Sequence, residues 1–313
     1  MNEIGDKSED EKIIERNFPL QQMRKIKQYL LDDNVTEIML NADGYIRIED
    51  NIKKYKTDIF LSDDEAMSII TAVASENNKE MSRDTGGIIS GILATGDRFE
   101  GINGEASGHK TIFCIRKKAR KIYTLDDYVE SQIISEAEKD YIIEKIKERK
   151  NVLIIGGTSS GKTTFANACL NVLKDSGDRI IILEDTPELQ CSADDTVKLQ
   201  TTETEQMIEL LQSTMRLNPT RIIVGELRKG IDTLELLKAW NSGHSGMTTY
   251  PITDLVNKLY SYSKIDFMQD TFQSLISNTV DIVVEMKDKK VKEIKEIIGY
   301  KKDLRESIYK NII

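Results

Sequence analysis

The fold of this 313-residue chain is decided by the stretch Val152-Leu-Ile-Ile-Gly-Gly-Thr-Ser-Ser-Gly-Lys-Thr-Thr164. An apolar run typical of a buried strand leads into Gly156-x-x-x-x-Gly161-Lys162-Thr163, and apolar residues at helical spacing follow it. A phosphate-binding loop requires this order of strand, glycine-rich loop and helix. The sequence therefore predicts that the chain binds a nucleoside triphosphate.

The loop residues have separate roles in binding such a ligand. The glycines allow successive backbone N–H groups to surround a phosphate, and the positive N-terminal end of the following helix faces the same anion. Lys162 is expected to reach the β- and γ-phosphates, and the Thr163 hydroxyl to ligate Mg²⁺. The expected cofactors are ATP and Mg²⁺, and the expected ATP-binding residues are Gly157, Thr158, Ser159, Ser160, Gly161, Lys162, Thr163 and Thr164.

Two strand ends beyond this loop carry the carboxylates that hydrolysis would need. The apolar run 180–183 leads into Glu184 and Glu188, and the run 222–224 leads into Glu226. Ligands bind at the carboxyl ends of the strands in an open parallel sheet. We therefore expect Glu226, together with Glu184 or Glu188, to face Mg²⁺ and the attacking water.

Arginines and a histidine lie near the second acidic strand end. Arg216, Arg221 and Arg228 bracket it, and each is either a structural ion-pair partner or a group that stabilises a γ-phosphate, including that of a neighbouring subunit. His244 lies in the segment 243–249, which follows a helix. We expect this segment to be a loop near the γ-phosphate, with Arg216 and His244 as catalytic candidates.

The alternation of apolar patterns predicts a mainly parallel sheet with crossover helices over residues 131–313. Residues 281–285 and 291–298 flank a lysine-rich turn and predict a terminal hairpin. The expected strands are 179–183 and 221–224, and the expected helices are 135–149, 205–217 and 233–240.

Residues 17–130 predict a separate domain of mixed α and β structure, preceded by a charged and flexible N-terminus, 1–16. Residues 123–128 are expected to connect the two domains. The expected elements are a helix over 20–31, a hairpin of 36–40 and 45–49, a helix over 63–75, a glycine-rich loop over 86–96 and a strand over 111–115 that ends in the basic cluster 116–121.

Composition narrows the class of protein. The net charge is -9, with 44 Lys and Arg against 53 Asp and Glu, which argues against stable direct binding of nucleic acid. The charged residues 1–12 contain no secretory signal, and no apolar run approaches the roughly 20 residues that cross a bilayer. Cys114, Cys169 and Cys191 form no CxxC pair and are expected to be free thiols in a reducing cytoplasm.

Four motifs occur in one order along the chain: Gly156-Gly-Thr-Ser-Ser-Gly-Lys-Thr-Thr164, Ile182-Leu-Glu-Asp-Thr-Pro-Glu-Leu-Gln190, Met215-Arg-Leu-Asn-Pro-Thr-Arg-Ile-Ile-Val-Gly-Glu226 and Leu236-Leu-Lys-Ala-Trp-Asn-Ser-Gly-His244. They resemble the Walker A motif, aspartate box, Walker B motif and start of the histidine box of traffic ATPases in bacterial secretion systems. Over residues 20–300 the chain looks most like the Trb-type conjugal transfer ATPases of type IV secretion.

This resemblance implies an N-terminal α/β domain joined to a RecA-like P-loop ATPase domain. It also implies a hexameric ring at the cytoplasmic face of the inner membrane that contacts inner-membrane components of the secretion system peripherally. Such a ring hydrolyses ATP to power pilus assembly or the transfer of DNA–protein substrates. Arg98 and Arg116 match N-terminal-domain positions thought to touch the nucleotide, which gives the basic cluster a role in closing the domains over ATP.

The chain departs from the family pattern at two places. Ser159 stands where glycine is usual, and a serine is strained there if the position needs a positive φ. The histidine box normally continues to a second histidine, whereas Tyr250 or Pro251 occupies that position here. His244 is therefore the remaining histidine of the box, and turnover or its coupling to motion is expected to be weaker.

Three alternatives stay open at this point. A type II secretion or type IV pilus ATPase would share the boxes, although such proteins often carry a CxxC zinc module that this chain lacks. A nucleotide-binding structural subunit with weak hydrolysis would fit the altered histidine box. A RecA-like helicase would grip nucleic acid directly, and the acidic balance counts against it.

Overall fold

The computed structural model describes residues 9–50, 52–118, 122–202, 204–251, 269–301 and 306–312. The chain forms two compact units, Met1–Lys121 and Ile122–Ile313, so the division lies before the expected boundary at residue 130. Residues 119–121 of the basic cluster lie outside the described residues. No helix in the described ranges is both long and apolar enough to span a bilayer.

The first unit is built on a six-stranded antiparallel sheet with the order β3-β2-β1-β6-β5-β4. Its inward side chains alternate with outward ones, as the pleat requires. The predicted hairpin of 36–40 and 45–49 is confirmed as β1 and β2. The strands are β1 Val35–Leu40, β2 Tyr45–Asp50, β3 Lys54–Phe60, β4 Gly87–Ile92, β5 Arg98–Asn103 and β6 Ile112–Arg116.

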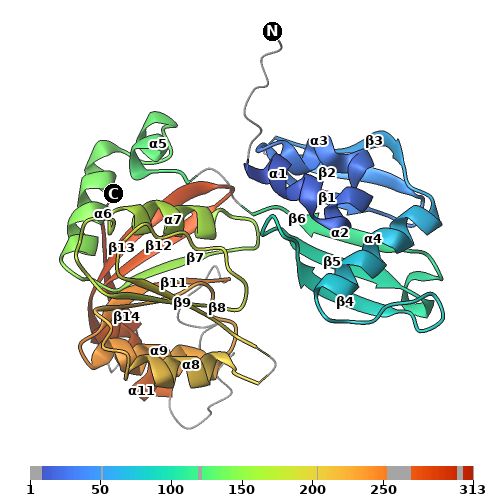
Figure 1. Ribbon diagram of the computed structural model, residues 1–313. Helices are drawn as coiled ribbons and strands as arrows, with labels where there is room; N and C mark the ends of the chain where they lie inside the picture. Colours follow the sequence, from blue (N-terminus) through green and yellow to red (C-terminus); the bar gives the residue numbers. More distant parts are fainter. Residues whose placement is uncertain are drawn as a thin grey trace. The chain divides into compact units, whose positions relative to one another are not determined.

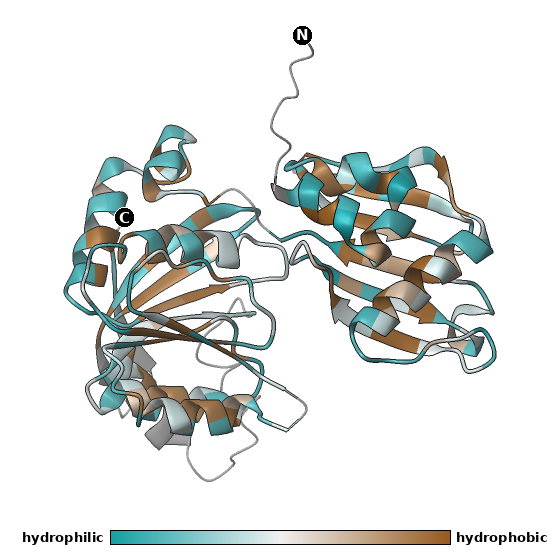
Figure 2. Cartoon of the chain, viewed as in Figure 1, coloured by the Kyte–Doolittle hydropathy of each residue, from teal (hydrophilic) through white to brown (hydrophobic). Residues whose placement is uncertain are grey.

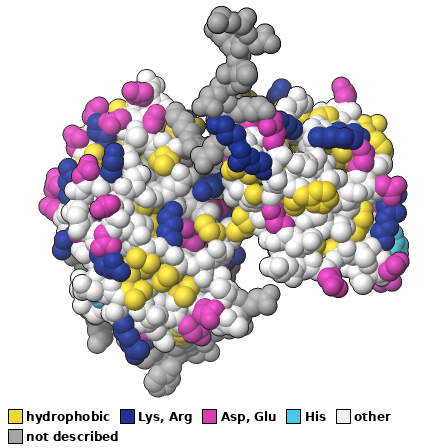
Figure 3. Space-filling view, in the orientation of Figure 1, with side chains coloured by type: hydrophobic (Ala, Val, Ile, Leu, Met, Phe, Trp, Pro, Cys, Tyr) yellow, Lys and Arg dark blue, Asp and Glu magenta, His cyan; other side chains and the backbone are white. Residues whose placement is uncertain are grey.

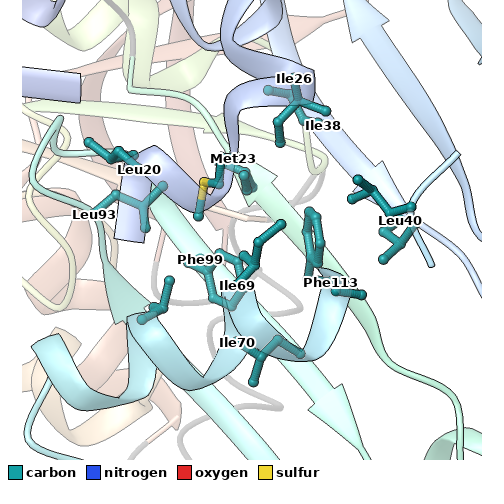
Figure 4. Close-up of a cluster of buried hydrophobic side chains, with 14 of the residues drawn as sticks. Leu20, Met23, Ile26, Ile38, Leu40, Ile69, Ile70, Leu93, Phe99 and Phe113 are labelled. Carbon is teal, nitrogen blue, oxygen red and sulfur yellow. The ribbon is translucent and has the colours of Figure 1, made fainter. Parts of the chain in front are cut away.

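Helices cross one face of this sheet in Figure 1. Helix α4 begins at a capping box in which Ser62 and Glu65 satisfy each other's backbone N–H groups. Its buried Ile69 and Ile70 join Phe99 and Phe113 in the core shown in Figure 4. The helical elements are α1 Glu9–Arg16, α2 Phe18–Gln22, η1 Arg24–Ile26, α3 Lys27–Leu31, α4 Asp63–Glu76 and η2 Glu105–Ser107.

Three sequence expectations for this unit differ from the structure. The single helix over 20–31 is three short pieces, with breaks at Met23, where ψ is 17°, and at Ile26, where ψ is 7°. The glycine-rich segment 86–96 is largely strand β4, because it pairs with β5 and buries Ile89 against the core. Residues 9–16, expected to be part of a flexible N-terminus, form helix α1.

The second unit holds an eight-stranded sheet with the order β14-β13-β12-β7-β11-β10-β8-β9. The six strands from β12 to β9 are parallel, whereas β13 and β14 are antiparallel, so the predicted parallel sheet and terminal hairpin are both confirmed. The strands are β7 Val152–Gly156, β8 Ile180–Glu184, β9 Thr196–Gln200, β10 Arg221–Val224, β11 Ser245–Tyr250, β12 Ile282–Lys287, β13 Lys290–Lys301 and β14 Glu306–Asn311.

Helices cover both faces of this sheet, and the strands between them are apolar (Figures 1 and 2). Ile154 and Ile182 contribute to the core on the α6 and α7 side, while their neighbours Leu153 and Leu183 belong to the core on the α8 and α9 side. Near-continuous apolar runs are typical of strands buried on both faces. The helices are α5 Leu125–Glu130, α6 Glu136–Lys147, α7 Lys162–Asn171, α8 Met207–Thr214, α9 Gly230–Asn241 and α11 Gln269–Thr279.

The expected interdomain connection at 123–128 largely forms helix α5 of the second unit. Thr124 caps this helix with a capping box, and Leu125 and Tyr128 are buried. The Tyr128 ring meets the ring of Phe165 on α7 edge to face, with 5.3 Å between centroids. Acidic and basic side chains are interspersed over the surface in view in Figure 3.

Candidate active site

The phosphate loop joins buried β7 to helix α7 at the carboxyl edge of the parallel strands. Gly156 is required by a close approach, because a Cβ there would lie 2.4 Å from the Met286 carbonyl oxygen of β12. Gly161 is the N-cap of α7 and has a φ of 94°, a left-handed backbone that glycine adopts without strain. The loop therefore has the backbone geometry that its glycines predict.

Ser159 has a φ of 57°, which is the left-handed region. The position therefore needs a positive φ, which glycine adopts without strain and serine does not. Its side chain is exposed, so no packing in the described structure compensates it. The phosphate loop thus stores backbone strain at the place where the family usually has glycine.

Lys162 is buried at the first position of α7, and its Nζ donates to the Gly157 carbonyl oxygen at 2.8 Å. Burial lowers the pKa of Lys162, while the charges of Glu226 and Glu188 raise it. These two carboxylates come from different strand ends, so the structure brings three of the expected residues together. The same arrangement leaves an ammonium group at the mouth of an anion-binding loop.

The loop after β8 presents Glu188 to the phosphate-loop helix. Thr163 Oγ1 lies 3.4 Å from Glu188 Oε2. A hydroxyl and a carboxylate oxygen are hard oxygen donors of the kind that Mg²⁺ prefers. The donor set therefore fits the expected Mg²⁺ ligand Thr163, with Glu188 beside it.

Glu184 is buried and supports the backbone of the loop after β8, and its side chain is not exposed at the site. Its Oε1 accepts the backbone N–H groups of Glu188 and Leu189, both at 2.8 Å. Burial raises the pKa of Glu184, and these two hydrogen bonds act in the opposite direction. A Cβ on Gly225 would lie 2.9 Å from Glu184 Cγ, so glycine lets the end of β10 approach it. Glu184 thus fixes the loop that carries Glu188.

Asn167 completes this arrangement, and the sequence reasoning missed it. It lies one turn beyond Thr163 on α7 and is 3% exposed. Its Nδ2 donates to the Glu188 carbonyl oxygen at 3.2 Å, and its Oδ1 accepts the Gln190 N–H at 2.8 Å. The available signal was an amide flanked by Phe165, Ala166, Ala168 and Cys169 in the helical run, because a buried amide needs partners.

Glu226 follows β10 on the same sheet edge. Arg228 Nε donates to its Oε2 at 2.9 Å, and Arg228 also lies 3.9 Å from Asp185. Arg228 is therefore an ion-pair partner of both acidic loops. Arg221 is not at the site: it is buried and donates to Asp178 at 2.5 Å, at the start of the strands.

His244 lies at the opposite edge from the phosphate loop, so its expected position was wrong. Residues 245–250 form strand β11 and not a loop, and β11 runs parallel to β7 with Tyr250 paired to Ile155. His244 precedes this strand, and its Nδ1 lies 3.0 Å from the Pro219 carbonyl oxygen. The strand pairs in parallel with β7 on one side and β10 on the other, and all six of its residues are buried.

Arg216 lies at that same amino edge of the sheet. It is exposed in the segment between α8 and β10, where the neighbouring Leu217 carbonyl accepts from Arg179. Since β10 starts at Arg221 and its carboxyl end holds Glu226, Arg216 and Glu226 are at opposite ends of one strand. The structure therefore does not bring Arg216 to the phosphate loop of its own subunit.

Arg98 and Arg116 lie side by side in the first unit, as register partners on β5 and β6. The Arg116 guanidinium donates to Glu37 Oε1 at 2.7 and 2.9 Å. Lys117 of the basic cluster is buried and donates to the Tyr29 and Asp32 carbonyl oxygens. The cluster is thus partly structural, with Arg116 on its exposed side.

The strand order, phosphate loop and carboxylate-bearing strand ends define a RecA-like P-loop domain. The type II/IV secretion system protein family model matches residues 108–306. This chain belongs to that family.

Named relatives cover most of the chain. The conjugal transfer protein TrbB of Rhizobium radiobacter is 40% identical over 287 residues, which are 87% of this chain and 86% of that protein. The probable conjugal transfer protein TrbB of Sinorhizobium fredii is 41% identical over 261 residues, covering 82% and 79%. The type IV secretion system protein VirB11 of Bartonella quintana is 27% identical over an alignment of 319 residues, which covers 86% of this chain and 88% of that protein.

Solved structures support the fold. The ATPase DotB of Legionella pneumophila matches with a TM-score of 0.64 and 17% identity, covering 94% of this chain and 80% of that one. The pilus retraction motor PilT with bound ADP matches with a TM-score of 0.64 and 16% identity, covering 90% and 84%. The expected combination of an N-terminal α/β domain and a RecA-like domain is confirmed.

Proposed function

We propose that this protein is an ATP-hydrolysing motor of a conjugative type IV secretion system. The observation that carries the proposal is the buried Lys162, held between the phosphate loop and the charges of Glu226 and Glu188. The relatives named as conjugal transfer proteins span most of the chain and favour conjugation over type II secretion or pilus retraction.

Each residue of the site has a task in this reaction. The loop N–H groups and Lys162 bind the phosphates, and Lys162 exchanges the Gly157 carbonyl for them. Thr163 would hold Mg²⁺, which neutralises phosphate charge when bound. Glu226 orients the attacking water, Arg228 holds the Glu226 carboxylate, and Glu188 lies beside Thr163.

The assembly is a hexameric ring that docks on inner-membrane components at the cytoplasmic face. The exposed Arg216 at the amino edge is then suited to reach the γ-phosphate bound by a neighbouring subunit. Arg98 and Arg116 contribute from the N-terminal unit to closing the site over ATP.

Steady-state ATP hydrolysis by the purified protein with Mg²⁺ tests the activity. Lys162→Ala should abolish turnover and sharply weaken ATP binding, because it removes the buried charge that meets the phosphates. Glu226→Gln should keep ATP binding and slow turnover by about 10²–10⁴-fold, the usual contribution of a water-activating group. A loss below about threefold on Glu226→Gln would transfer that role to Glu188.

A weakly hydrolysing structural subunit is the second candidate. Pro251 directly follows buried Tyr250 at the carboxyl end of β11, where the histidine box of the family continues to a histidine. Proline has no backbone N–H and fixes φ. ATP binding without measurable turnover in the wild-type ring would favour this candidate over a motor.

A further inference from the structure

The turn between β12 and β13 packs directly against the phosphate loop. The Lys289 backbone N–H donates to the Ser160 carbonyl oxygen at 3.2 Å. A Cβ on Gly161 would lie 3.4 Å from Lys289 Cα, and Met286 pairs with Gly156 in the sheet. The turn therefore forms a wall of the site, although it lies far along the chain from the phosphate-loop motif.

Both central residues of this turn have a left-handed backbone. Asp288 has a φ of 52° and Lys289 a φ of 62°, and the flanking Lys287 and Lys290 are paired. Two-residue turns of this type favour Asn-Gly, because glycine adopts a positive φ freely. Lysine is a poor choice for the turn alone, and strained residues of this kind gather at functional sites.

The turn also concentrates positive charge beside an anion-binding loop. Lys287, Lys289 and Lys290 are all exposed, and Lys289 has the closest backbone contacts with the loop. An ammonium group forms strong charge-assisted hydrogen bonds to phosphate oxygens. Lys162 would meet bound phosphates from the helix side, and the Lys289 backbone contacts the loop from the turn that follows β12.

We propose that Lys289 is a second phosphate-binding cation of the site, brought to the nucleotide by the strained β12–β13 turn. The proposal rests on the proposed function, in that the loop must bind ATP. It assigns the turn a binding role that the boxes of the family do not include.

The substitution Lys289→Gly removes the ammonium group while keeping the backbone turn. Glycine keeps the N–H that bonds to Ser160 and removes the backbone strain, so the free variant should melt at the same or a higher temperature. Calorimetric titration in the presence of Mg²⁺ measures the affinity of the variant for ATP, ADP and AMP. ATP binding should weaken about fivefold, ADP binding should weaken less, and AMP binding should weaken least, because the lost attraction scales with phosphate charge. The difference from wild type should shrink at high salt.

Two further variants make the result specific. Lys289→Arg should bind ATP within about twofold of wild type, and Lys290→Gln, which removes the same charge from a neighbouring exposed position, should lose less than Lys289→Gly. The proposal is overturned if Lys289→Gly binds ATP like wild type, or if ATP and AMP binding weaken equally. A wild-type protein that binds no ATP, or a Lys162→Ala variant that binds it normally, would instead refute the proposed function.

Discussion

Asn167 connects the helix that starts at the phosphate loop to the loop that carries Glu188. Its amide bonds two backbone groups of that loop while Glu184 holds two more from the other side. The position of Glu188 beside Thr163 is therefore determined by buried hydrogen bonds rather than by the loop itself. Asn167 and Glu184 act as positioning residues.

Asn167→Ala should lower ATP turnover tenfold or more while ATP affinity stays within a few-fold. Misplacing a reacting group by about 1 Å costs on the order of 10²-fold, whereas the phosphate loop remains intact. The Mg²⁺ concentration that gives half-maximal turnover should rise in the same assay. Asn171→Ala, at the end of the same helix, is the control, and equal turnover in the two variants would contradict the positioning role.

Ser159→Gly should stabilise the protein by about 1 kcal/mol, because it relieves a left-handed residue that has a Cβ. Urea unfolding without nucleotide measures the difference. Ser131→Gly, at a helix end with a φ of -79°, should instead destabilise by a few tenths of a kcal/mol through the entropy of the unfolded chain. A loss of stability in both variants would show that strain at Ser159 is absent.

At the scale of elements, strand β11 separates the two ends of the histidine box. A six-residue strand with a rise of about 3.3 Å per residue places Ser245 roughly 17 Å from Tyr250. His244 lies before one end, bonded to the Pro219 carbonyl, and Tyr250 lies at the phosphate-loop end. We therefore expect no direct contact between His244 and a nucleotide bound at the phosphate loop of its own subunit.

His244→Ala should therefore leave ATP affinity unchanged within a few-fold, measured by titration. Any loss of turnover should appear in the assembled ring and not in the monomer. His244 lies at the amino edge of the sheet together with Arg216, which we propose acts on the nucleotide of a neighbouring subunit. Equal turnover of His244→Ala and wild type in the ring would make the residue structural. A fall in ATP affinity would contradict the placement of His244.

Apolar patterning predicted the elements that are uniformly apolar. The Ile-rich runs before Glu184 and Glu226 are buried on both faces, so composition alone identified β8 and β10 and the acidic ends of the site. Strand β11 was missed because it begins with Ser245 and Gly246, which are poor strand formers, directly after a glycine-containing turn that reads as a loop. Asn167 and Glu184 acquire their roles from backbone groups that the fold brings to them, which spacing does not reveal.

At the scale of the whole molecule, the family and the exposed Arg216 lead us to expect assembly into a ring. The described part of the chain offers Arg216 at the edge opposite to its own phosphate loop, which is the placement that an arginine acting on a neighbour would need. Light scattering with Mg²⁺ and a non-hydrolysable ATP analogue should show a closed ring with the mass of six chains. A monomer at micromolar concentration and above would contradict a ring motor.

The contact of β12 with the phosphate loop has a consequence for synthesis of the protein. Asn151, at the start of β7, bonds to Asp281, which lies 130 residues later, and Gly156 and Ser160 rest on Met286 and Lys289. The phosphate-loop motif leaves the ribosome long before the strand that supports it. We therefore expect the phosphate loop to reach its folded form only after residues 286–289 have left the ribosome, and a product truncated before them should bind ATP poorly.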